Sequence, residues 1–392
     1  MRRFLTVLSA VSLAGFLGLG SAQASTGRSL AAHHGGPHVS VFASGLNNPR
    51  GLTFGPDGNL YVAQGGLGGH HSTVGKCQQA AGAAAPYTGS TNNPALGGRI
   101  AKISRSGKVT TVVKALPSSQ TSPALGSLVS GVSSVAFIGH QLYALLAGAG
   151  CSHGVPSVPN GVIKVGKHGH WRLIANLSAF QKANPVANPD PADFEPDGTW
   201  YSMIAIGGAL YPMDSNHGEL DRVTRSGHIS RVIDISASQG HVVPTAIVHH
   251  HGATFIANLG VFDPSDGTGD EHVWRLTPRR TLRVHATGVE KVLGLAFRDG
   301  RPYALEMNTT AGGPTPGTGA IVQLGPSGPV KTIVSGLTSQ TGMTVGSDEA
   351  FYVSNQGLGF GPGGPDPAHH ALTATAIPGQ PRGGPGSLAL AT

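Results

Sequence analysis

Two acidic segments contain the residues with the clearest capacity for metal chemistry. The first segment, Asn188–Gly198, holds four carboxylates: Asp190, Asp193, Glu195 and Asp197. The second segment holds Asp263, Asp266, Asp270 and Glu271. Clustered carboxylate oxygens suit Ca²⁺, but neither segment has the D-x-[DN]-x-[DN]-G spacing of a dedicated calcium loop. Two interpretations of the first segment therefore remain, a calcium site and a solvated acidic turn.

A second set of candidates lies at a fixed distance from a recurring aromatic residue. The aromatics are Tyr61, Tyr143, Tyr211, Phe255, Tyr303 and Tyr352. The residues three positions later are Gln64, Leu146, Asp214, Asn258, Glu306 and Asn355. The five polar ones, together with Arg50, could surround a channel mouth and bind a polar ligand or a cation. Alternatively, they bond the backbone groups at which each strand stops.

Histidine and cysteine give weaker chemical signals. His249–His251 and His70–His71 are runs of neighbours, whose side chains point apart in an extended chain, so surface histidines are favoured over a zinc site. Cys77 and Cys151 are the only cysteines. A disulfide between them is predicted if the chain is exported, and two separate thiols are the alternative.

Catalytic signals are few. The sequence has no HExxH segment and no phosphate-binding loop. Asp214 and Glu306 could pair as an acid and a base across a channel, but sequence supplies no distance between them. We therefore predict no catalytic residue from the sequence.

These candidates depend on a repeat of short strands. In Phe42–Gly66, a strand at Gly51–Phe54, a turn and a strand at Leu60–Ala63 predict a β-hairpin. A second hairpin follows in Gly98–Val113, and four successive antiparallel strands make one propeller blade. The pattern recurs with a basic period in the mid-forties. The sequence thus predicts an all-β fold, a six-bladed β-propeller of four-stranded antiparallel blades.

The two ends of the chain are expected to meet. Val39–Leu46, VSVFASGL, matches Val330–Leu337, VKTIVSGL. We expect the N-terminal strand 38–46 to close the ring by joining the C-terminal blade, because closure pairs two exposed strand edges. Residues 38–370 are then one propeller domain, after a flexible segment 25–37. Residues 371–392 are a low-complexity tail that could begin with one strand, the missing third strand of the closing blade.

The long connections fall on one face of the predicted disc. Examples are Gly65–Gly97, Gly148–Asn160 and Gly260–Glu271, whereas the turns within hairpins are short. Loops lengthened on one side of a rigid scaffold are typical of a binding face. Neutral variation of surface loops is the alternative.

The N-terminus and the charge indicate the compartment and exclude one class of partner. Arg2 and Arg3, the apolar run Phe4–Gly20 and Ala22-Gln23-Ala24 predict a signal peptide over residues 1–24, with an uncleaved anchor as the alternative. The net charge is +7, and charged residues make up only 11% of the chain. No basic run is present, so nucleic-acid binding is not expected.

Four stretches resemble the ScyD/ScyE family of exported propeller proteins. They are Asn47–Gly66 (NNPRGLTFGPDGNLYVAQGG), Ala175–Asp190 running on to Met213–Val223, Val242–Val248 (VVPTAIV) and Thr341–Gly363. Their order and spacing hold over residues 38–365. The resemblance implies a secreted, NHL-like six-bladed propeller but transfers no catalytic residue. Asp348-Glu349 departs from the usual Asp-Gly turn.

Together these patterns predict a secreted, monomeric, non-catalytic propeller that binds a small molecule or a protein through its long-loop face. The alternative is an enzyme that uses the central channel, either a metal-dependent hydrolase of the lactonase kind or a quinone-dependent dehydrogenase. No cofactor is firmly predicted, and Ca²⁺ is the possible one.

Overall fold

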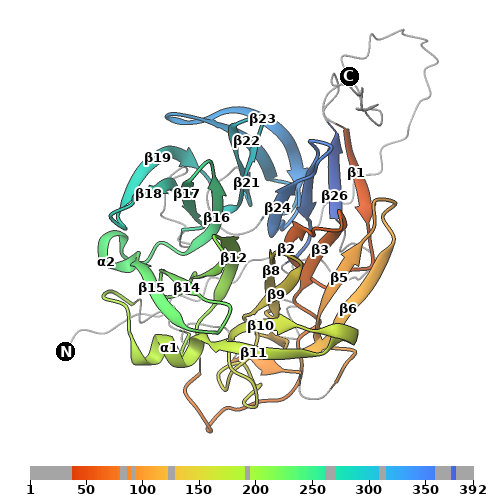
Figure 1. Ribbon diagram of the computed structural model, residues 1–392, viewed down its shortest axis with the longest axis vertical. Coiled ribbons are helices and arrows are strands. Elements are labelled where there is room, and N and C mark those ends of the chain that lie inside the picture. The colour runs from red at the N-terminus through yellow and green to blue at the C-terminus, as the bar shows by residue number, and fades with distance from the viewer. Residues whose placement is uncertain are drawn as a thin grey trace, which may run out of the picture. The chain divides into compact units, whose positions relative to one another are not determined.

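The computed structural model describes residues 38–79, 86–90, 93–121, 129–189, 195–260, 271–308, 315–357 and 372–376. Within these ranges, short antiparallel strands form sheets that surround a central axis (Figure 1). The expected signal peptide, residues 1–24, and the expected flexible segment, residues 25–37, lie outside the described residues. The protein is therefore an all-β propeller in its described part.

Five four-stranded sheets are blades whose strands follow one another along the chain. The first blade contains β2 (Pro49–Phe54), β3 (Leu60–Gln64), β5 (Gly98–Ile103) and β6 (Val109–Leu116). The second contains β8 (Val132–Ile138), β9 (Gln141–Leu146), β10 (Gly161–Val165) and β11 (Trp171–Asn176). The third contains β12 (Trp200–Ile206), β13 (Ala209–Asp214), β14 (Glu219–Val223) and β15 (Ile229–Asp234). The fourth contains β16 (Pro244–His250), β17 (Ala253–Asn258), β18 (Glu271–Leu276) and β19 (Leu282–Val289). The fifth contains β20 (Val292–Arg298), β21 (Arg301–Glu306), β22 (Gly319–Gly325) and β23 (Gly328–Leu337).

The predicted six-bladed propeller is corrected to one with five blades whose strands follow one another along the chain. The remaining sheet has the order β1-β26-β25-β24, with strands from both ends of the described chain. Its members are β1 (His38–Ala43), β24 (Gly342–Val345), β25 (Phe351–Ser354) and β26 (Leu372–Ala376). The physical reason is that the C-terminal segment supplies only three strands, so β1 pairs with the edge of β26 that would otherwise be open. β26 lies beyond residue 370, in the segment that was expected to begin with one strand, the third strand of this sheet.

Helices are few and short in the described chain. They are α1 (Leu177–Ala183), α2 (Ser236–Gln239) and the 3₁₀ turn η1 (Lys167–Gly169). Asn176 caps α1, since its side chain accepts a hydrogen bond from the Ala179 N–H at 2.9 Å. No helix in the described ranges is long and apolar enough to cross a membrane. A two-residue ribbon, β4 (Thr88–Gly89) with β7 (Ser119–Gln120), joins two of the long connections.

The repeated hairpin is held by a turn aspartate and the aromatic of the returning strand. Asp57 accepts hydrogen bonds from the Asn59 N–H at 3.1 Å and from the Tyr61 hydroxyl at 3.0 Å. Asp348 is bonded in the same way, to the Ala350 N–H at 3.2 Å and to the Tyr352 hydroxyl at 2.9 Å. The pattern read from the sequence thus has a local cause, because one carboxylate satisfies both the turn backbone and the tyrosine.

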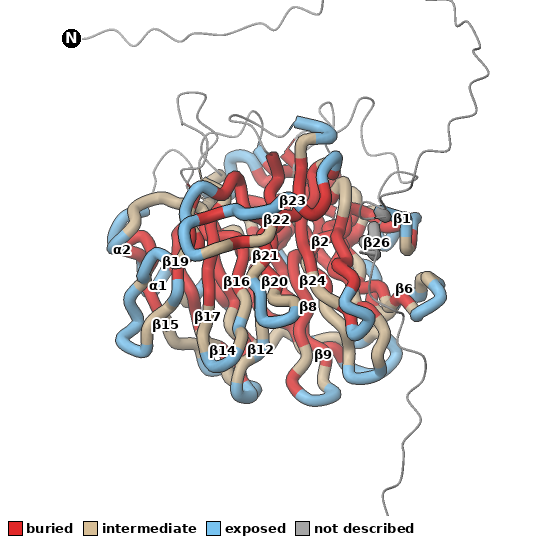
Figure 2. The backbone as a smooth tube through the Cα atoms, turned by 90° about the horizontal axis from the view of Figure 1, so that it is seen from above, coloured by how far each residue is buried: buried red, intermediate tan, exposed pale blue. Residues whose placement is uncertain are grey.

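The hydrophobic core lies in the layers between neighbouring sheets. Trp200, the largest fully buried side chain, packs with Tyr143 and Leu177 between the second and third blades. Figure 2 shows buried segments along the strands and exposed segments concentrated at the hairpin turns. Inner strands such as β8 and β9 bury side chains on both faces, whereas the outer strands β6 and β19 are largely exposed.

Side-chain hydrogen bonds also link the sheets around the axis. Thr341 Oγ1 donates to the Pro49 carbonyl at 2.6 Å and so joins the β24 sheet to the first blade. Ser134 bonds the Met203 carbonyl, and Thr245 bonds the Val292 carbonyl. These bonds satisfy inner-strand carbonyls that have no partner strand on the axis side.

Two faces of the disc are used below. The short-turn face is the end of the disc at which the turn between Phe54 of β2 and Leu60 of β3 lies. The equivalent hairpin turns of the other sheets lie at the same end. The long-loop face is the opposite end, at which β2 begins and β3 ends.

Candidate functional site

The five recurring polar residues each accept a backbone N–H. The donors are Asn47 for Gln64 (2.7 Å), Thr199 for Asp214 (3.2 Å), His272 for Asn258 (2.8 Å), Glu290 for Glu306 (3.1 Å) and Thr338 for Asn355 (3.0 Å). Four of these donors lie one to four residues before the first strand of the same sheet, and His272 lies in β18. The bonds correspond to the second interpretation given above, in which these side chains satisfy backbone groups where strands begin and end.

Arg50 and Tyr201 lie at the long-loop end of the axis. The Tyr201 hydroxyl donates to the Thr341 carbonyl at 2.9 Å, and Arg50 Nη2 donates to the Val129 carbonyl. Burial raises the pKa of Tyr201 to about 12, although the Arg50 guanidinium works in the opposite direction. Burial also lowers the pKa of Arg50 from its ordinary value, with Tyr201 opposing this effect. The tyrosine therefore stays neutral beside a buried cation.

A cavity of about 370 Å³ occupies the axis below Tyr201. Its walls come from the first strands, from Gly51 and Thr341 at one end to Phe54 and His249 at the other. None of its lining residues is acidic. Asp214 and Glu306, which could have formed an acid and base pair, do not line it. The cavity can hold a small molecule, but it offers little for acid–base chemistry.

The first acidic segment is only half described. Asp190 and Asp193 lie outside the described residues. Asp197 accepts hydrogen bonds from the Ser152 hydroxyl at 2.6 Å and from Lys182 Nζ at 2.7 Å. Burial works to raise the pKa of Asp197, but Lys182 and Ser152 outweigh it, and the pKa is lowered. Within the described ranges, no three His, Cys, Asp or Glu side chains are grouped as metal ligands.

The second acidic segment is described only from Glu271 onward. Glu271 Oε1 lies 2.7 Å from Lys291 Nζ, and both side chains are 3% exposed. Asp263, Asp266 and Asp270 lie outside the described residues. The visible carboxylate is therefore already neutralised by a buried lysine.

The long-loop face brings together a serine, a histidine and a glutamate from three connections. Ser119 Oγ lies 2.9 Å from His153 Nδ1. On the other side of the imidazole, His153 Nε2 lies 3.3 Å from Glu195 Oε2, a close approach without hydrogen-bond alignment. If Nδ1 accepts from the serine, the ring proton is on Nε2 and faces the carboxylate. This order of nucleophile, base and orienting acid is that of a hydrolytic triad.

Further contacts fix this Ser119–His153–Glu195 triad. The Tyr87 hydroxyl donates to Glu195 Oε1 at 3.1 Å, and the Tyr87 ring lies against the imidazole with centroids 4.3 Å apart. Thr199 donates to Glu195 Oε2. Ser119 and His153 are fully buried, and the Glu195 side chain is 12% exposed. Every member therefore has its orientation set by neighbours from a different loop.

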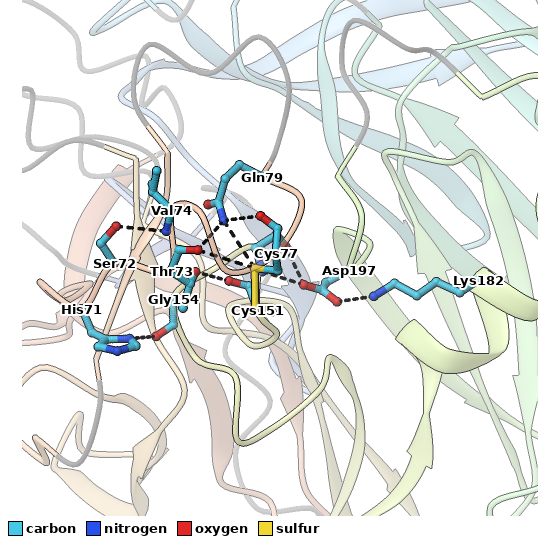
Figure 3. The surroundings of a disulfide bond; sticks show 11 residues. His71, Ser72, Thr73, Val74, Cys77, Gln79, Cys151, Gly154, Lys182 and Asp197 are labelled. Carbon is cyan, nitrogen blue, oxygen red and sulfur yellow. Dashed lines mark hydrogen bonds and ion pairs between the residues drawn. A yellow bond between two sulfur atoms is a disulfide. The ribbon is translucent and has the colours of Figure 1, made fainter.

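A disulfide holds the loop that carries His153. Cys77 and Cys151 are bonded, with Cα atoms 6.1 Å apart and a sequence separation of 74 residues. Figure 3 shows Thr73 bonded to the Cys151 carbonyl and His71 bonded to the Gly154 carbonyl at 2.7 Å. The two neighbours of His153 in the chain are therefore each tied to other residues, Gly154 to His71 and Ser152 to Asp197.

A second buried histidine lies next to the triad. His217 Nδ1 lies 3.0 Å from Asp214 Oδ2, and His217 Nε2 lies 2.5 Å from Gln181 Nε2. Burial works to lower the pKa of His217, but Asp214, Glu219 and Glu195 outweigh it, and the pKa is raised. Because Glu195 contributes, the two histidine sites share one electrostatic environment.

The histidine run lies away from this site. His249 and His250 end β16 at the short-turn face, and the His250 ring stacks on Phe297 with centroids 4.0 Å apart. The run thus packs on an aromatic side chain, and no three-ligand group is formed by it in the described part of the chain.

Sequence reasoning missed the triad. Its members are separated by 34 and 42 residues, so no local motif joins them. One signal was present, since Gly150–Gly154 reads GCSHG and matches the G-x-S-x-G pattern. Ser152 of this stretch bonds Asp197, and the stretch lies between β9 and β10 without a following helix, so it is no nucleophile elbow. It does mark the loop that carries His153.

No family model and no curated protein matches the chain. Solved structures do. A proposed oxidoreductase (glucose dehydrogenase) from Thermus thermophilus is 17% identical, with a TM-score of 0.54 over 87% of this chain and 100% of that one. A gluconolactonase from Xanthomonas campestris is 9% identical, with a TM-score of 0.53 over 87% and 90%. The quinone-bound (PQQ) aldose sugar dehydrogenase from Streptomyces coelicolor is 12% identical, with a TM-score of 0.50 over 86% and 97%. At these identities the likeness establishes the propeller fold alone.

The described residues do not fit a bound calcium ion. They also do not fit a quinone cofactor that is held by a calcium ion. Among them no three carboxylate, histidine or cysteine side chains converge. The side-chain oxygens that could have formed a ring at the channel mouth accept backbone N–H groups instead. No chemical step is therefore assigned to such a group.

Proposed function

We propose that this protein is a hydrolase of small esters or lactones that works through Ser119, His153 and Glu195. The single observation that carries the proposal is the Ser119–His153–Glu195 arrangement on the long-loop face. The gluconolactonase and the two sugar dehydrogenases of similar fold support a sugar-derived substrate, such as a sugar lactone.

The first step is acylation of Ser119. As the Ser119 oxygen attacks the carbonyl carbon, its proton moves to His153 Nδ1. The resulting imidazolium is stabilised by the charge of Glu195, whose Oε2 lies 3.3 Å from Nε2. Collapse of the tetrahedral intermediate breaks the bond to the ring oxygen, which takes the proton from Nδ1. The product is an acyl-serine that carries the opened hydroxyl chain.

The second step is hydrolysis of the acyl-serine. Water attacks the same carbonyl carbon and gives a proton to His153 Nδ1. The bond to Ser119 then breaks, and the serine oxygen recovers that proton. Tyr87 and Thr199 hold the Glu195 carboxylate throughout, since each donates to one of its oxygens.

Burial sets a condition on this mechanism. Ser119 and His153 have no exposed surface, so a substrate reaches them only after a covering side chain moves. Tyr87, 6% exposed, packs against the imidazole with ring centroids 4.3 Å apart and is the covering side chain that we expect to move. A serine-directed reagent, a fluorophosphonate, measures this access directly. We expect slow labelling of Ser119, faster in Tyr87→Ala.

The decisive experiment compares Ser119→Ala with Ser130→Ala. Ser130 faces Ser119 across a backbone bridge and serves as the matched control. Hydrolysis of gluconolactone and of p-nitrophenyl acetate is followed, together with the melting temperature. Ser119→Ala should lower kcat/KM at least about 100-fold while Ser130→Ala keeps it. Equal rates in Ser119→Ala and the wild type would overturn the proposal, as would the absence of any turnover in the wild type.

That last outcome would favour the competing proposal, a non-catalytic propeller that binds its ligand or partner at the same face.

Export also stays a proposal, supported by the pattern of residues 1–24 and by the disulfide. N-terminal sequencing of the mature protein tests it. A relationship to the ScyD/ScyE family is supported only by the four sequence stretches given above. Monomeric state and lack of nucleic-acid binding are likewise proposals.

A further inference from the structure

Arg50 is a buried cation without a carboxylate partner in the described chain. The Arg50 residue is 8% exposed, and its Nη2 donates a hydrogen bond to the Val129 carbonyl. Arg50 also interacts with Tyr201, whose pKa burial raises to about 12, and with Tyr87. None of the ion pairs between described residues includes Arg50.

The other buried lysine or arginine of the described chain, Lys291, is paired with a carboxylate, and so is the partly buried Arg231. Lys291 lies 2.7 Å from Glu271, and Arg231 lies 2.5 Å from Glu219. Burying a charge is costly unless it is paired or satisfied by hydrogen bonds. A guanidinium has five N–H donors, and one carbonyl with one tyrosine hydroxyl uses only part of them. Arg50 is therefore a charged group with more N–H donors than these two partners occupy.

The position of Arg50 connects it to the proposed triad. Val129, whose carbonyl it bonds, precedes Ser130, and Ser130 pairs through its backbone with Ser119 at 2.8 and 2.9 Å. Tyr87, which interacts electrostatically with Arg50, packs against His153 with ring centroids 4.3 Å apart. The residue also precedes Gly51, at which the axial cavity begins. Arg50 thus lies between the triad and the axis.

We propose that Arg50 binds a carboxylate of the ligand, so that this protein selects acidic sugar derivatives. A carboxylate matches the forked donors of a guanidinium, which can hold both oxygens at once. The inference rests on the proposed function only for the chemistry at Ser119, because an anion can bind beside Arg50 without being hydrolysed. The substrates of the hydrolase are then lactones or esters that carry a carboxylate apart from the bond that is cleaved.

The test measures binding of sodium glucuronate and of glucose to the full chain by isothermal titration calorimetry. The two sugars differ by a carboxylate in place of a CH₂OH group. The wild type should bind glucuronate at least tenfold more tightly than glucose, and added salt should weaken only the glucuronate binding. Equal affinity for the two sugars, or no binding of glucuronate at all, would overturn the proposal.

Variants assign the effect to Arg50. Arg50→Gln should lower glucuronate affinity at least tenfold and leave glucose binding unchanged. Arg105→Gln removes the same charge at the short-turn face and should bind like the wild type. Undiminished affinity in a folded Arg50→Gln protein would refute the assignment. If that variant does not fold, the comparison of glucuronate with glucose on the wild type still tests whether the protein prefers an acidic sugar.

The two proposals fail separately. Ser119→Ala that hydrolyses at the wild-type rate removes the catalytic proposal but leaves the glucuronate comparison intact. A loss of turnover in Ser119→Ala, together with unchanged glucuronate binding in Arg50→Gln, removes only the anion site. Both stand if Ser119→Ala binds glucuronate normally and has lost turnover.

Discussion

Glu306 is a carboxylic acid whose stability contribution should depend on pH. It ends β21, is 4% exposed, and accepts the Glu290 N–H at 3.1 Å through Oε1. Burial raises its pKa to about 7, and the charges of Glu290 and Glu271 add to this, although the Glu290 N–H opposes it. Lys291 is the nearby cation, but it lies against Glu271 at 2.7 Å. The folded protein therefore holds the proton of Glu306 more tightly than the unfolded chain does.

The magnitude and sign follow from this difference. A pKa raised from 4.5 to about 7 corresponds to about 3 kcal/mol of folding free energy. Because the folded-state pKa is raised, this contribution is fully present below pH 4.5 and is lost as the pH rises through about 7. Glu306→Gln keeps an oxygen for the Glu290 N–H and removes the titration. The variant should match the wild type near pH 4.5 and exceed its stability by up to about 3 kcal/mol at pH 8.5.

Urea unfolding of both proteins at the two pH values measures the difference. Other buried carboxylates also titrate, among them Glu219 with a pKa raised to about 8 and Asp221 with one raised to about 7, chiefly by burial. Their effects cancel when variant and wild type are compared at one pH. Glu349→Gln, which removes a 46% exposed carboxylate, is the control. A stability difference that stays constant between the two pH values would refute the reasoning.

Two further predictions concern the ring and its loops. Replacing both cysteines by serine should cost up to about 4 kcal/mol, since the bond closes a loop of 74 residues, and urea unfolding with and without dithiothreitol measures this. An unchanged midpoint would mean that the loops are held by their hydrogen bonds alone. Thr341→Val should cost about 1 kcal/mol by leaving the Pro49 carbonyl without its 2.6 Å bond, whereas Thr344→Val should cost less. Equal losses in thermal unfolding would show that the bond does not help to close the ring.

The hairpin repeat could be predicted because its causes are local. Asp57 and Tyr61 are four residues apart, and their hydrogen bond needs only the turn between them. The same bond forms at Asp348 and Tyr352, although Glu349 replaces the usual glycine there and adopts φ 60°. The aromatic spacing therefore identified the strands even where the turn residue departed from the pattern.

The number and composition of the blades were less predictable. Five blades follow one another along the chain, but the last sheet depends on β1 meeting β26 from the opposite end. The similarity of Val39–Leu46 to Val330–Leu337 correctly predicted that the N-terminal strand joins the last sheet, whereas the count of six blades was wrong. The sequence did not decide whether the recurring polar residues bind a ligand or a backbone group, because that depends on which N–H groups lie opposite them in the folded sheet.

The sequence by itself determined the strands, their turns and the face that carries the long connections, since each follows from residues a few positions apart. Only the tertiary structure decided which loop residues meet. Ser119, His153 and Glu195 belong to three connections, and Arg50 reaches Val129 across 79 residues. Those distances depend on how neighbouring sheets pack around the axis, because a rotation of one sheet by a few degrees would separate side chains that now touch.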